Sequence, residues 1–207
     1  MSMVVVIDYG LGNLFSVSKA FERVGAEVVI SSNPEDIRKA DRIVLPGVGA
    51  FGDGMDYLRS KGIDKALTVA VIEKQKPFLG ICLGMQLLAD IGQEYGEYKG
   101  LGWISGVVRK LEVEKLGLKI PHIGWNDIQI VHDSPLFRGL PAVSDFYFVH
   151  SYQLICQEPT DIAAVTDYGE QITAAIQRKN IFATQFHPEK SQDNGLILIE
   201  NFMNWQP

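Results

Sequence analysis

Cys82 is the residue of this sequence best placed to act as a nucleophile. It follows an apolar run and is the centre of the segment Gly80-Ile81-Cys82-Leu83-Gly84. A strand, a sharp turn and a helix over this segment would form a nucleophile elbow, whose glycines leave room for an exposed central side chain. Unpaired N–H groups in the first helical turn favour a thiolate there. Leu83 N–H could then bind the oxyanion that forms when the thiolate attacks a carbonyl carbon.

A base for this nucleophile is offered by His187-Pro188-Glu189. In extended backbone, residues two apart leave the same face, so the Glu189 carboxylate could orient the His187 imidazole. Pro188 favours this because it keeps the preceding residue out of the helical region. The other ring nitrogen would then face the thiol, as in a Cys-His-Glu triad. Only folding can bring these distant segments together.

A buried structural thiol is the usual alternative for a single cysteine, because free cysteine packs as a small hydrophobe. Cys156, in the apolar stretch Leu154-Ile155-Cys156, fits that alternative. For Cys82, the elbow pattern together with His187-Pro188-Glu189 favours catalysis.

The composition predicts a soluble globular chain that is neither a nucleic-acid-binding nor a membrane protein. Its 207 residues suffice for one substantial domain, with 46% hydrophobic and 21% charged residues. A net charge of −6 disfavours nucleic acid and anionic membranes as main partners. The apolar run 1–7 is too short for a signal sequence, and two cysteines do not make a disulfide framework. We therefore expect a cytoplasmic location.

The first half of the chain alternates strand-like and helix-like patterns. We predict strands and helices from hydrophobic periodicity, with Asn13 capping the first helix and Gly25 ending it. The strands are 3–7, 27–30, 42–45 and 77–81, and the helices are 13–24 and 63–74. Such alternation predicts an α/β fold with an open, largely parallel sheet flanked by helices.

Beyond about Trp103 the pattern changes to short β-rich segments, which we predict to be antiparallel extensions of the sheet. They are 107–113, 127–131, 146–149, 162–165, 172–177 and 181–185, followed by a helix over 192–204. The segment Gly10-Leu11-Gly12-Asn13-Leu14-Phe15 is not a dinucleotide fingerprint, because Phe15 replaces the third glycine.

Several motifs together resemble the class I glutamine amidotransferases. The segments Gly80-Ile81-Cys82-Leu83-Gly84-Met85-Gln86 and His187-Pro188-Glu189 match that family as a whole. Pro46-Gly47-Val48-Gly49, Pro121-His122-Ile123-Gly124-Trp125-Asn126 and Tyr147-Phe148-Val149-His150-Ser151-Tyr152 narrow the resemblance to glutaminase subunits of imidazole glycerol phosphate synthases. The resemblance implies one glutaminase domain over residues 1–207.

The resemblance also implies roles for the site residues. Cys82, His187 and Glu189 would form the catalytic triad, with an oxyanion hole made by the N–H groups of Leu83 and Val48. Because glycines flank Val48, we expect its peptide plane to rotate at low cost and this half of the hole to be switchable. The residues that would bind glutamine are Gly49, Gln86, Glu94, Ser151 and Tyr152. For Gln86 and Glu94, the alternatives are a solvated helix residue and an ordinary surface glutamate.

By the same resemblance, the chain would hydrolyse L-glutamine and pass ammonia to a separate (β/α)₈ cyclase subunit that makes imidazole glycerol phosphate in histidine biosynthesis. The residues that would face this partner are Asn13, Trp125, Tyr147 and Lys190. We expect no cofactor and no metal, since no His, Cys, Asp and Glu cluster has zinc spacing.

Three other functions stay open at this level. The chain could be a glutaminase that serves another synthase, such as one for pyridoxal phosphate or anthranilate. It could be a cysteine peptidase on a related scaffold, which would ignore free glutamine. It could also be a non-catalytic binding module, which would tolerate loss of Cys82.

Overall fold

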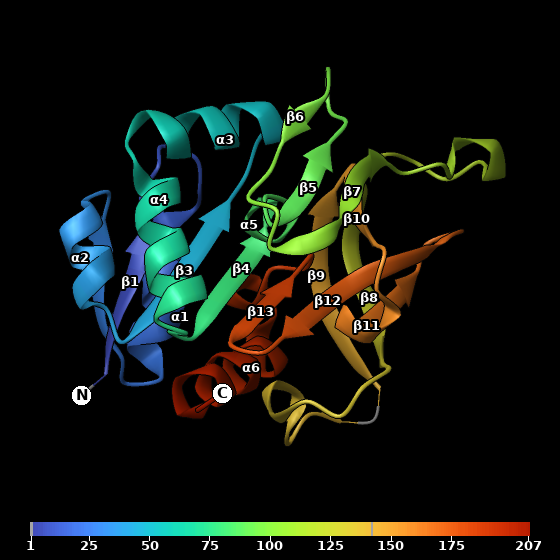
Figure 1. Cartoon of the computed structure of the whole chain (residues 1–207). Coiled ribbons are helices and arrows are strands. Elements are labelled where there is room, and N and C mark those ends of the chain that lie inside the picture. Colours follow the sequence, from blue (N-terminus) through green and yellow to red (C-terminus); the bar gives the residue numbers. More distant parts are fainter. Residues whose placement is uncertain (1, 142) are drawn as a thin grey trace.

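The computed structural model describes residues 2–141 and 143–207 and contains a nine-stranded sheet in the order β2-β1-β3-β4-β13-β12-β11-β8-β9 (Figure 1). Strands from β2 to β13 in this order pair in parallel, and those from β13 to β9 pair antiparallel. The strands are β1 (Met3–Ile7), β2 (Glu27–Ser31), β3 (Arg42–Gly47), β4 (Phe78–Cys82), β8 (His122–Ile130), β9 (Ser144–His150), β11 (Ile162–Asp167), β12 (Gln171–Arg178) and β13 (Ile181–Thr184).

Helices cover both faces of the parallel part of this sheet (Figure 1). They are α1 (Leu14–Arg23), α2 (Pro34–Lys39), α3 (Phe51–Ser60), α4 (Ile63–Leu67) continued by the π-helix η1 (Thr68–Glu73), the short α5 (Leu83–Gln86) and α6 (Gln192–Asn204). Val5 and Ile7 of β1 share a buried cluster with α2, α3 and α4, whereas Val4 and Val6 share one with α1 and α6. Alternation along a strand thus buries both faces.

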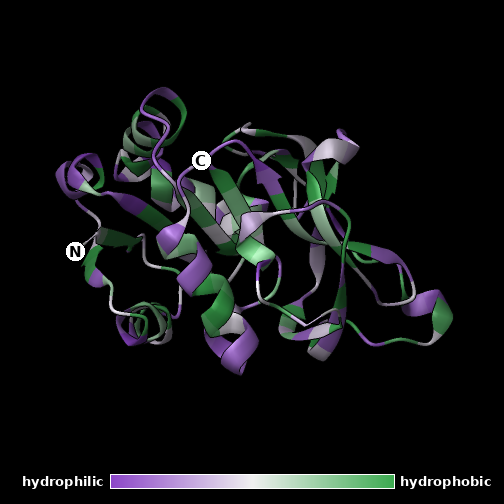
Figure 2. Ribbon diagram, turned by 90° about the horizontal axis from the view of Figure 1, so that it is seen from below, coloured by the Kyte–Doolittle hydropathy of each residue, from purple (hydrophilic) through white to green (hydrophobic). Residues whose placement is uncertain are grey.

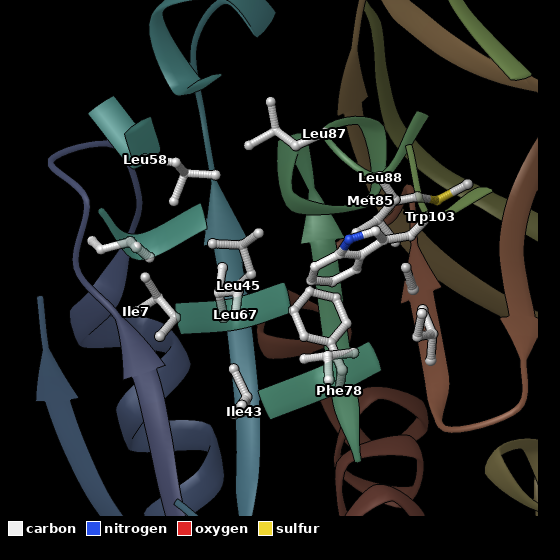
Figure 3. Packing of buried hydrophobic residues seen from close by; sticks show 14 of the residues in the cluster. Ile7, Ile43, Leu45, Leu58, Leu67, Phe78, Met85, Leu87, Leu88 and Trp103 are labelled. Atoms are coloured by element: carbon white, nitrogen blue, oxygen red, sulfur yellow. The ribbon is translucent and has the colours of Figure 1, made fainter. Parts of the chain in front are cut away.

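The core on the α3–α4 side is drawn in Figure 3, where Ile7, Ile43 and Leu45 point from the strands toward Leu58 and Leu67. At its far edge, Phe78 and Trp103 form an edge-to-face pair with ring centroids 5.4 Å apart. Each such fully buried large side chain contributes roughly 1.5–3 kcal/mol relative to exposure, so this packing holds the central strands in place. Figure 2 shows the matching pattern, with hydrophobic colour along the central strands and mixed colour on the helices.

A second, four-stranded sheet has the order β10-β7-β5-β6 and lies beside the parallel strands (Figure 1). Its strands are β5 (Ala89–Gly92), β6 (Tyr98–Lys99), β7 (Ile104–Lys110) and β10 (Tyr152–Cys156). Four short 3-10 helices complete the chain, namely η2 (Glu114–Leu116), η3 (Pro135–Phe137), η4 (Pro159–Asp161) and η5 (Pro188–Lys190). None of the helices in the described ranges is both long and apolar enough to cross a membrane.

The α/β class and most predicted elements are confirmed, and the differences have physical causes. The strands of the second half are not all antiparallel: β13 pairs in parallel with β4, and β5 with β7. The predicted helix 63–74 is α4 followed by a π-helical stretch. Periodicity does not predict α2, which has six residues, or α3, whose sequence includes Gly52 and Gly54. A Cβ on Gly52 would lie 2.8 Å from Tyr98, so tertiary packing requires the glycine.

The predicted ends of the first and last helices also agree with the structure. The Asn13 side chain accepts from Ser16 N–H at 3.3 Å and caps α1, and Gly25 follows its end at φ +85°. The last helix, α6, runs over the predicted residues. Cap chemistry is local, which is why these boundaries are readable in the sequence.

Candidate active site

Cys82 ends β4 and precedes α5, at a backbone turn with φ 54° and ψ −108°. Such a left-handed φ is rare for a residue with a side chain and is typical of a strained nucleophile elbow. The two glycines of the motif are required sterically. A Cβ on Gly84 would overlap the Leu45 carbonyl oxygen, and one on Gly80 would lie 2.8 Å from the Gly84 carbonyl oxygen. Close packing of the turn against β3 therefore fixes the direction of the Cys82 side chain.

The helix after the elbow differs from the expected helical run, because α5 has only four residues. The chain then turns at Leu87 and Leu88 into β5. A helix this short has little macrodipole, so the N–H groups nearest Cys82, including that of Leu83, are the relevant positive groups.

His187 reaches Cys82 because β13, which leads to it, pairs in parallel with β4, with Thr184 opposite Ile81. His187 N–H donates to Tyr147 O at 2.9 Å, and Ser191 Oγ donates to His187 O at 2.6 Å. These bonds tie the backbone on both sides of the imidazole to β9 and to the start of α6. The base segment is therefore held by elements that the sequence pattern alone does not connect.

His187 and Glu189 form a buried pair, with Nδ1 and Oε1 2.8 Å apart and side chains 3% and 1% exposed. His187 itself is extended, as expected, but Pro188–Lys190 form a 3-10 turn instead of continuing the strand. Lys190 N–H donates to His187 O at 3.0 Å and closes this turn. The carboxylate thus meets the imidazole across a turn and not along one face of a strand.

The electrostatics of the site favour a charged imidazole. Burial lowers the pKa of His187, but the Cys82 thiolate and then Glu189 outweigh burial and raise it to about 10. Within the described residues, His187 Nε2 has no hydrogen-bond partner, so this nitrogen is free for a reacting group. Cys82 Sγ lies 3.6 Å from Gln185 Nε2 and 3.8 Å from Val149 O. The structure therefore brings Cys82, His187 and Glu189 to one place.

A pocket of about 430 Å³ opens in front of Cys82. It collects all the predicted oxyanion and substrate residues. Its lining consists of Val48, Gly49, Ala50, Cys82, Leu83, Gln86, Glu94, Tyr95, Pro121, Val149, His150, Ser151 and Tyr152. A cavity of this size with few polar groups fits one small amino acid.

Two of the predicted substrate residues are not the solvated side chains of the alternative interpretation. Gln86 is buried, and its Nε2 donates to Tyr152 O at 2.9 Å and to Gln185 Oε1 at 3.0 Å. Glu94 accepts from Phe51 N–H at 2.8 Å, which also caps α3. Burial raises the pKa of Glu94 despite this bond. Both residues thus have structural partners in the pocket wall as well as a face toward the cavity.

We expected both glycines that flank Val48 to let its peptide plane rotate. In the structure this does not hold for Gly47. Gly47 pairs with Cys82 in the β3–β4 ladder, and a Cβ on it would overlap the Tyr9 hydroxyl. Gly47 is therefore fixed by packing. Gly49 has φ +113°, a Cβ on it would meet only the Leu11 side chain at 3.7 Å, and Val48 is 43% exposed. Packing therefore constrains the Gly47 side of this loop more than the Gly49 side.

Three of the residues predicted to face a partner lie together. Trp125 on β8 is opposite Tyr147 on β9, and their ring centroids are 6.2 Å apart. Lys190 Nζ lies 5.7 Å from the Tyr147 ring centroid, a cation–π distance. Trp125 is 44% exposed. Asn13 has a structural role as the cap of α1 and lies outside this cluster.

Sequence reasoning missed Gln185, Tyr95 and His150 at the site. Gln185 is fully buried and donates toward Cys82 Sγ. The feature of the sequence that could have identified it is a polar residue at the end of an apolar strand. Tyr95 lines the pocket mouth, 86% exposed, at φ 56°.

Cys156 is a free thiol outside the pocket, and burial raises its pKa to about 12. Among the residues described, no group of three or more His, Cys, Asp or Glu side chains could hold a metal ion.

A family model described as "Glutamine amidotransferase class-I" matches residues 5–205. This chain belongs to the class-I glutamine amidotransferase family. Among curated members, "Imidazole glycerol phosphate synthase subunit HisH 1" of Campylobacter jejuni (strain RM1221) is 51% identical over 201 residues, covering 97% of this chain and 99% of that protein. "Imidazole glycerol phosphate synthase subunit HisH" of Brucella suis biovar 1 (strain 1330) is 50% identical over 216 residues, covering 99% of each.

Solved structures of other class-I glutamine amidotransferases and related proteins share the fold at low identity. PurLQS from Thermotoga maritima aligns with a TM-score of 0.77 and 19% identity over 99% of both chains. The glutaminase domain of CTPS from Trypanosoma brucei aligns with a TM-score of 0.67 and 18% identity over 100% of this chain and 96% of that one. The predicted family and fold class are thereby confirmed.

Proposed function

We propose that this chain is the glutaminase subunit of an imidazole glycerol phosphate synthase, with one glutaminase domain over residues 1–207. The observation that carries the proposal is the buried His187–Glu189 pair next to Cys82, whose thiolate raises the pKa of His187, at the wall of an amino-acid-sized pocket. A charged imidazole beside a thiolate is the resting state that thiol acyl transfer needs. The names of relatives about 50% identical over nearly whole chains support the choice of pathway.

In the first half-reaction, Cys82 Sγ attacks the side-chain amide carbon of L-glutamine. The C=O π electrons move to oxygen, and the oxyanion is stabilised by the N–H groups of Leu83 and Val48. Collapse of this intermediate re-forms C=O and breaks the C–N bond, while His187 donates its proton to the departing nitrogen. The products are ammonia and a glutamyl thioester on Cys82.

In the second half-reaction, neutral His187 takes a proton from water, whose oxygen attacks the thioester carbon. The same N–H groups hold the second oxyanion, and its collapse breaks the C–S bond. The thiolate and imidazolium return, and the product leaves as the side-chain acid, which ionises to glutamate by giving its proton to the solvent. Glu189, bonded to Nδ1 at 2.8 Å, orients the ring and stabilises its charged form throughout.

The α-substituents of glutamine would be held by the groups that line the same pocket. Glu94 would pair with the ammonium group, and Gln86 and Gly49 would border the chain of the substrate. Backbone N–H groups of Ser151 and Tyr152 would bind the carboxylate. Each of these residues lines the cavity, which supports the assignment.

The ammonia would pass to a (β/α)₈ cyclase partner, docked around Trp125, Tyr147 and Lys190, with Asn13 at the edge of that surface. Partly exposed aromatic rings with an adjacent cation are typical of interface hot spots. The Cys82 mechanism needs a reduced thiol, and both cysteines are free, so we infer that the protein works in the cytoplasm.

The test is glutamate release from L-glutamine by the full chain, alone and with the cyclase, in wild type, Cys82→Ala and Cys156→Ala. We expect Cys82→Ala to abolish hydrolysis and Cys156→Ala, which removes the other thiol, to retain it. The assembled synthase with Cys82→Ala should still work with added ammonium salt. Substantial hydrolysis by Cys82→Ala would disprove the nucleophile assignment, and cleavage of peptides in place of free glutamine would indicate a peptidase.

A further inference from the structure

Two buried histidines, His122 on β8 and His150 on β9, have no role in the mechanism above. They are opposite each other in the β8–β9 ladder and are 2% and 5% exposed. The His122 ring stacks on Phe148 and on Tyr168, with centroids 4.9 and 4.1 Å away and interplanar angles of 22° and 21°. Stacking of this kind holds the plane of the ring, so its nitrogens point in fixed directions.

The hydrogen bonds of these rings determine which nitrogen carries each proton. His150 Nδ1 lies 2.9 Å from Tyr152 O, and a carbonyl oxygen can only accept, so Nδ1 is the protonated nitrogen. Burial lowers the pKa of His150 to about 3 and that of His122 to about 4, so both rings are neutral near pH 7. His150 Nε2 is therefore an acceptor.

The same reasoning continues to His122 and Asn126. His122 Nδ1 lies 3.0 Å from His150 Nε2 and must donate to it, which leaves His122 Nε2 as an acceptor. Asn126 Nδ2 lies 3.3 Å from His122 Nε2 and 2.8 Å from Asp167 O, and donates to both. Asn126 Oδ1 accepts from Asp127 N–H at 2.9 Å, which fixes the orientation of the amide.

The result is a chain of hydrogen bonds with one direction, from Asn126 through His122 and His150 to Tyr152 O. That oxygen also accepts from Gln86 Nε2 at 2.9 Å. One end of this hydrogen-bond chain, Tyr152, thus lies in the wall of the proposed glutamine pocket. The other end, Asn126, is the sequence neighbour of Trp125 on β8. Because each ring must present one donor and one acceptor, reversing one member would break its neighbours' bonds.

The hydrogen-bond chain ends on Tyr152, a residue whose backbone N–H would bind substrate. Ser151 O accepts from Leu111 N–H of the strand beside β10 at 3.0 Å. In a trans peptide the C=O and the next N–H point in opposite directions, so Tyr152 N–H points away from Leu111. Tyr152 O, held by Gln86 and His150, also lies on the pocket side of the strand. Tyr152 O belongs to the peptide after Tyr152, and Tyr152 N–H belongs to the peptide before it. In the extended backbone of β10 both lie on the same side of the strand, so holding the carbonyl restrains the direction of the N–H.

We propose that His122 and His150 are positioning residues for glutamine binding, a fixed-tautomer pair that holds the Ser151–Tyr152 backbone for the α-carboxylate and links it to Asn126 beside Trp125. This inference rests on the proposed glutaminase function. Neither ring touches the reacting atoms; both act through the Tyr152 peptide. The pair would transmit a shift of the Trp125–Asn126 strand to the pocket, because moving Asn126 removes the donor that sets the His122 tautomer.

The binding test is the Kd for L-glutamine by calorimetry, in a Cys82→Ala background that prevents turnover. His122→Phe keeps a flat ring for the stack on Phe148 and Tyr168 but removes the donor to His150. We expect it to weaken binding on the order of tenfold, which corresponds to about 1.4 kcal/mol. His150→Leu should weaken binding at least as much, whereas His150→Asn, whose amide can still donate to Tyr152 O, should remain within about threefold. The control is His132→Gln. His132 is exposed and is not part of the hydrogen-bond chain, so this substitution should leave Kd unchanged.

A second readout is the tautomer itself, measured from imidazole ¹⁵N chemical shifts near pH 7. Both His122 and His150 should be in the Nδ1–H form, and His122→Phe should shift the ¹⁵Nε2 signal of His150, because this acceptor nitrogen loses its donor. A role limited to packing would not move this signal. Nε2–H tautomers in the parent, or an unchanged Kd in His122→Phe and His150→Leu, would overturn the proposal. A parent that does not bind L-glutamine would instead disprove the glutaminase function, while the tautomers would still be decided by NMR.

Discussion

The charge of the Cys82 thiolate and the carboxylate of Glu189 act on one imidazole, that of His187. Burial alone would lower the pKa of this ring, and the two negative groups reverse the shift. These neighbours thus favour an imidazolium at neutral pH, which is the form that the proposed mechanism needs in the catalytic acid. This coupling makes the protonation of His187 a direct probe of Cys82.

We predict that Cys82→Ala lowers the pKa of His187 from about 10, because the largest raising influence on it is removed. An NMR titration of the His187 ring in both proteins measures this. The sign for stability follows from the raised value in the folded state. The contribution of His187 to the free energy of unfolding is complete below about pH 6.5 and decreases as pH rises toward 10. If the pKa of His187 were the same in the two proteins, the proposed ion pair between Cys82 and His187 would be disproved.

We also predict that His187→Ala lowers kcat for glutamine hydrolysis more than Glu189→Gln does. His187 moves protons in both half-reactions, which typically contributes about 10²–10⁴-fold, whereas Glu189 orients and stabilises the ring. In Glu189→Gln the side-chain oxygen can still accept from Nδ1–H, so the ring keeps its orientation. Steady-state glutamate production with the partner present measures both variants, and a larger loss in Glu189→Gln would reverse the two roles.

At the scale of elements, the site is built where three neighbouring parallel strands end. The Val48 loop follows β3, the elbow follows β4, and His187 follows β13. Side chains and loops at the carboxyl ends of adjacent parallel strands necessarily meet at one edge of the sheet. The β3–β4 ladder places Gly47 opposite Cys82, so Val48, the proposed second oxyanion donor, is one residue from the strand partner of the proposed nucleophile.

We predict that Gly49→Val changes the activation of glutamine hydrolysis by the cyclase more than it changes association of the two subunits. Valine is disfavoured at φ +113°, so the substitution shifts the loop between its backbone states. Losing one oxyanion donor lowers kcat about 10²–10³-fold. The activation that such a switch could produce is therefore limited to about this factor. The measurement is the ratio of hydrolysis rates with and without the cyclase, its site empty or filled. The matched control is Gly117→Val, at φ +74° in open space on the η2 turn. Equal rates for the free and the bound subunit would rule the switch out.

At the scale of the whole molecule, the proposed partner surface and the pocket share the β8–β9 pair. Trp125, which is 44% exposed, and the partly buried Tyr147 lie on one face of this ladder, whereas His122 and His150 are buried on the other, with Val149 and His150 at the pocket. A partner that docks on Trp125 therefore contacts the strand that carries Asn126 and His122.

We predict that Trp125→Ala weakens association with the cyclase about tenfold or more, since a buried aromatic anchor typically contributes at least 1–2 kcal/mol. Lys190→Ala should have a smaller effect, because it removes one charge and its contact with the Tyr147 ring. The control is Lys39→Ala at the end of α2, which follows β2, the edge strand of the sheet opposite β9. Titration of labelled cyclase measures all three, and equal affinity for the Trp125 and Lys39 variants would place the interface elsewhere.

The sequence by itself was enough to predict the α/β class, the first and last helices and the residues of the candidate triad. These features depend on local physics. Hydrophobic period and the helix caps at Asn13 and Gly25 are set within a few residues along the chain, and the pattern of glycines around Cys82 is a short motif that can be read there. The sequence also indicated which residues line the pocket, through its resemblance to a known family.

Only the tertiary structure decided which segments meet. The parallel pairing of β13 with β4 brings His187 to Cys82 and adds Gln185, and the β8–β9 ladder brings His122 to His150. The glycines of α3 hide a helix from hydrophobic periodicity, because Gly52 makes room for Tyr98 and Gly54 lies against Leu87. Long-range contacts of this kind leave no trace in a local pattern, because the free energy that selects them comes from burial shared by residues far apart in the chain.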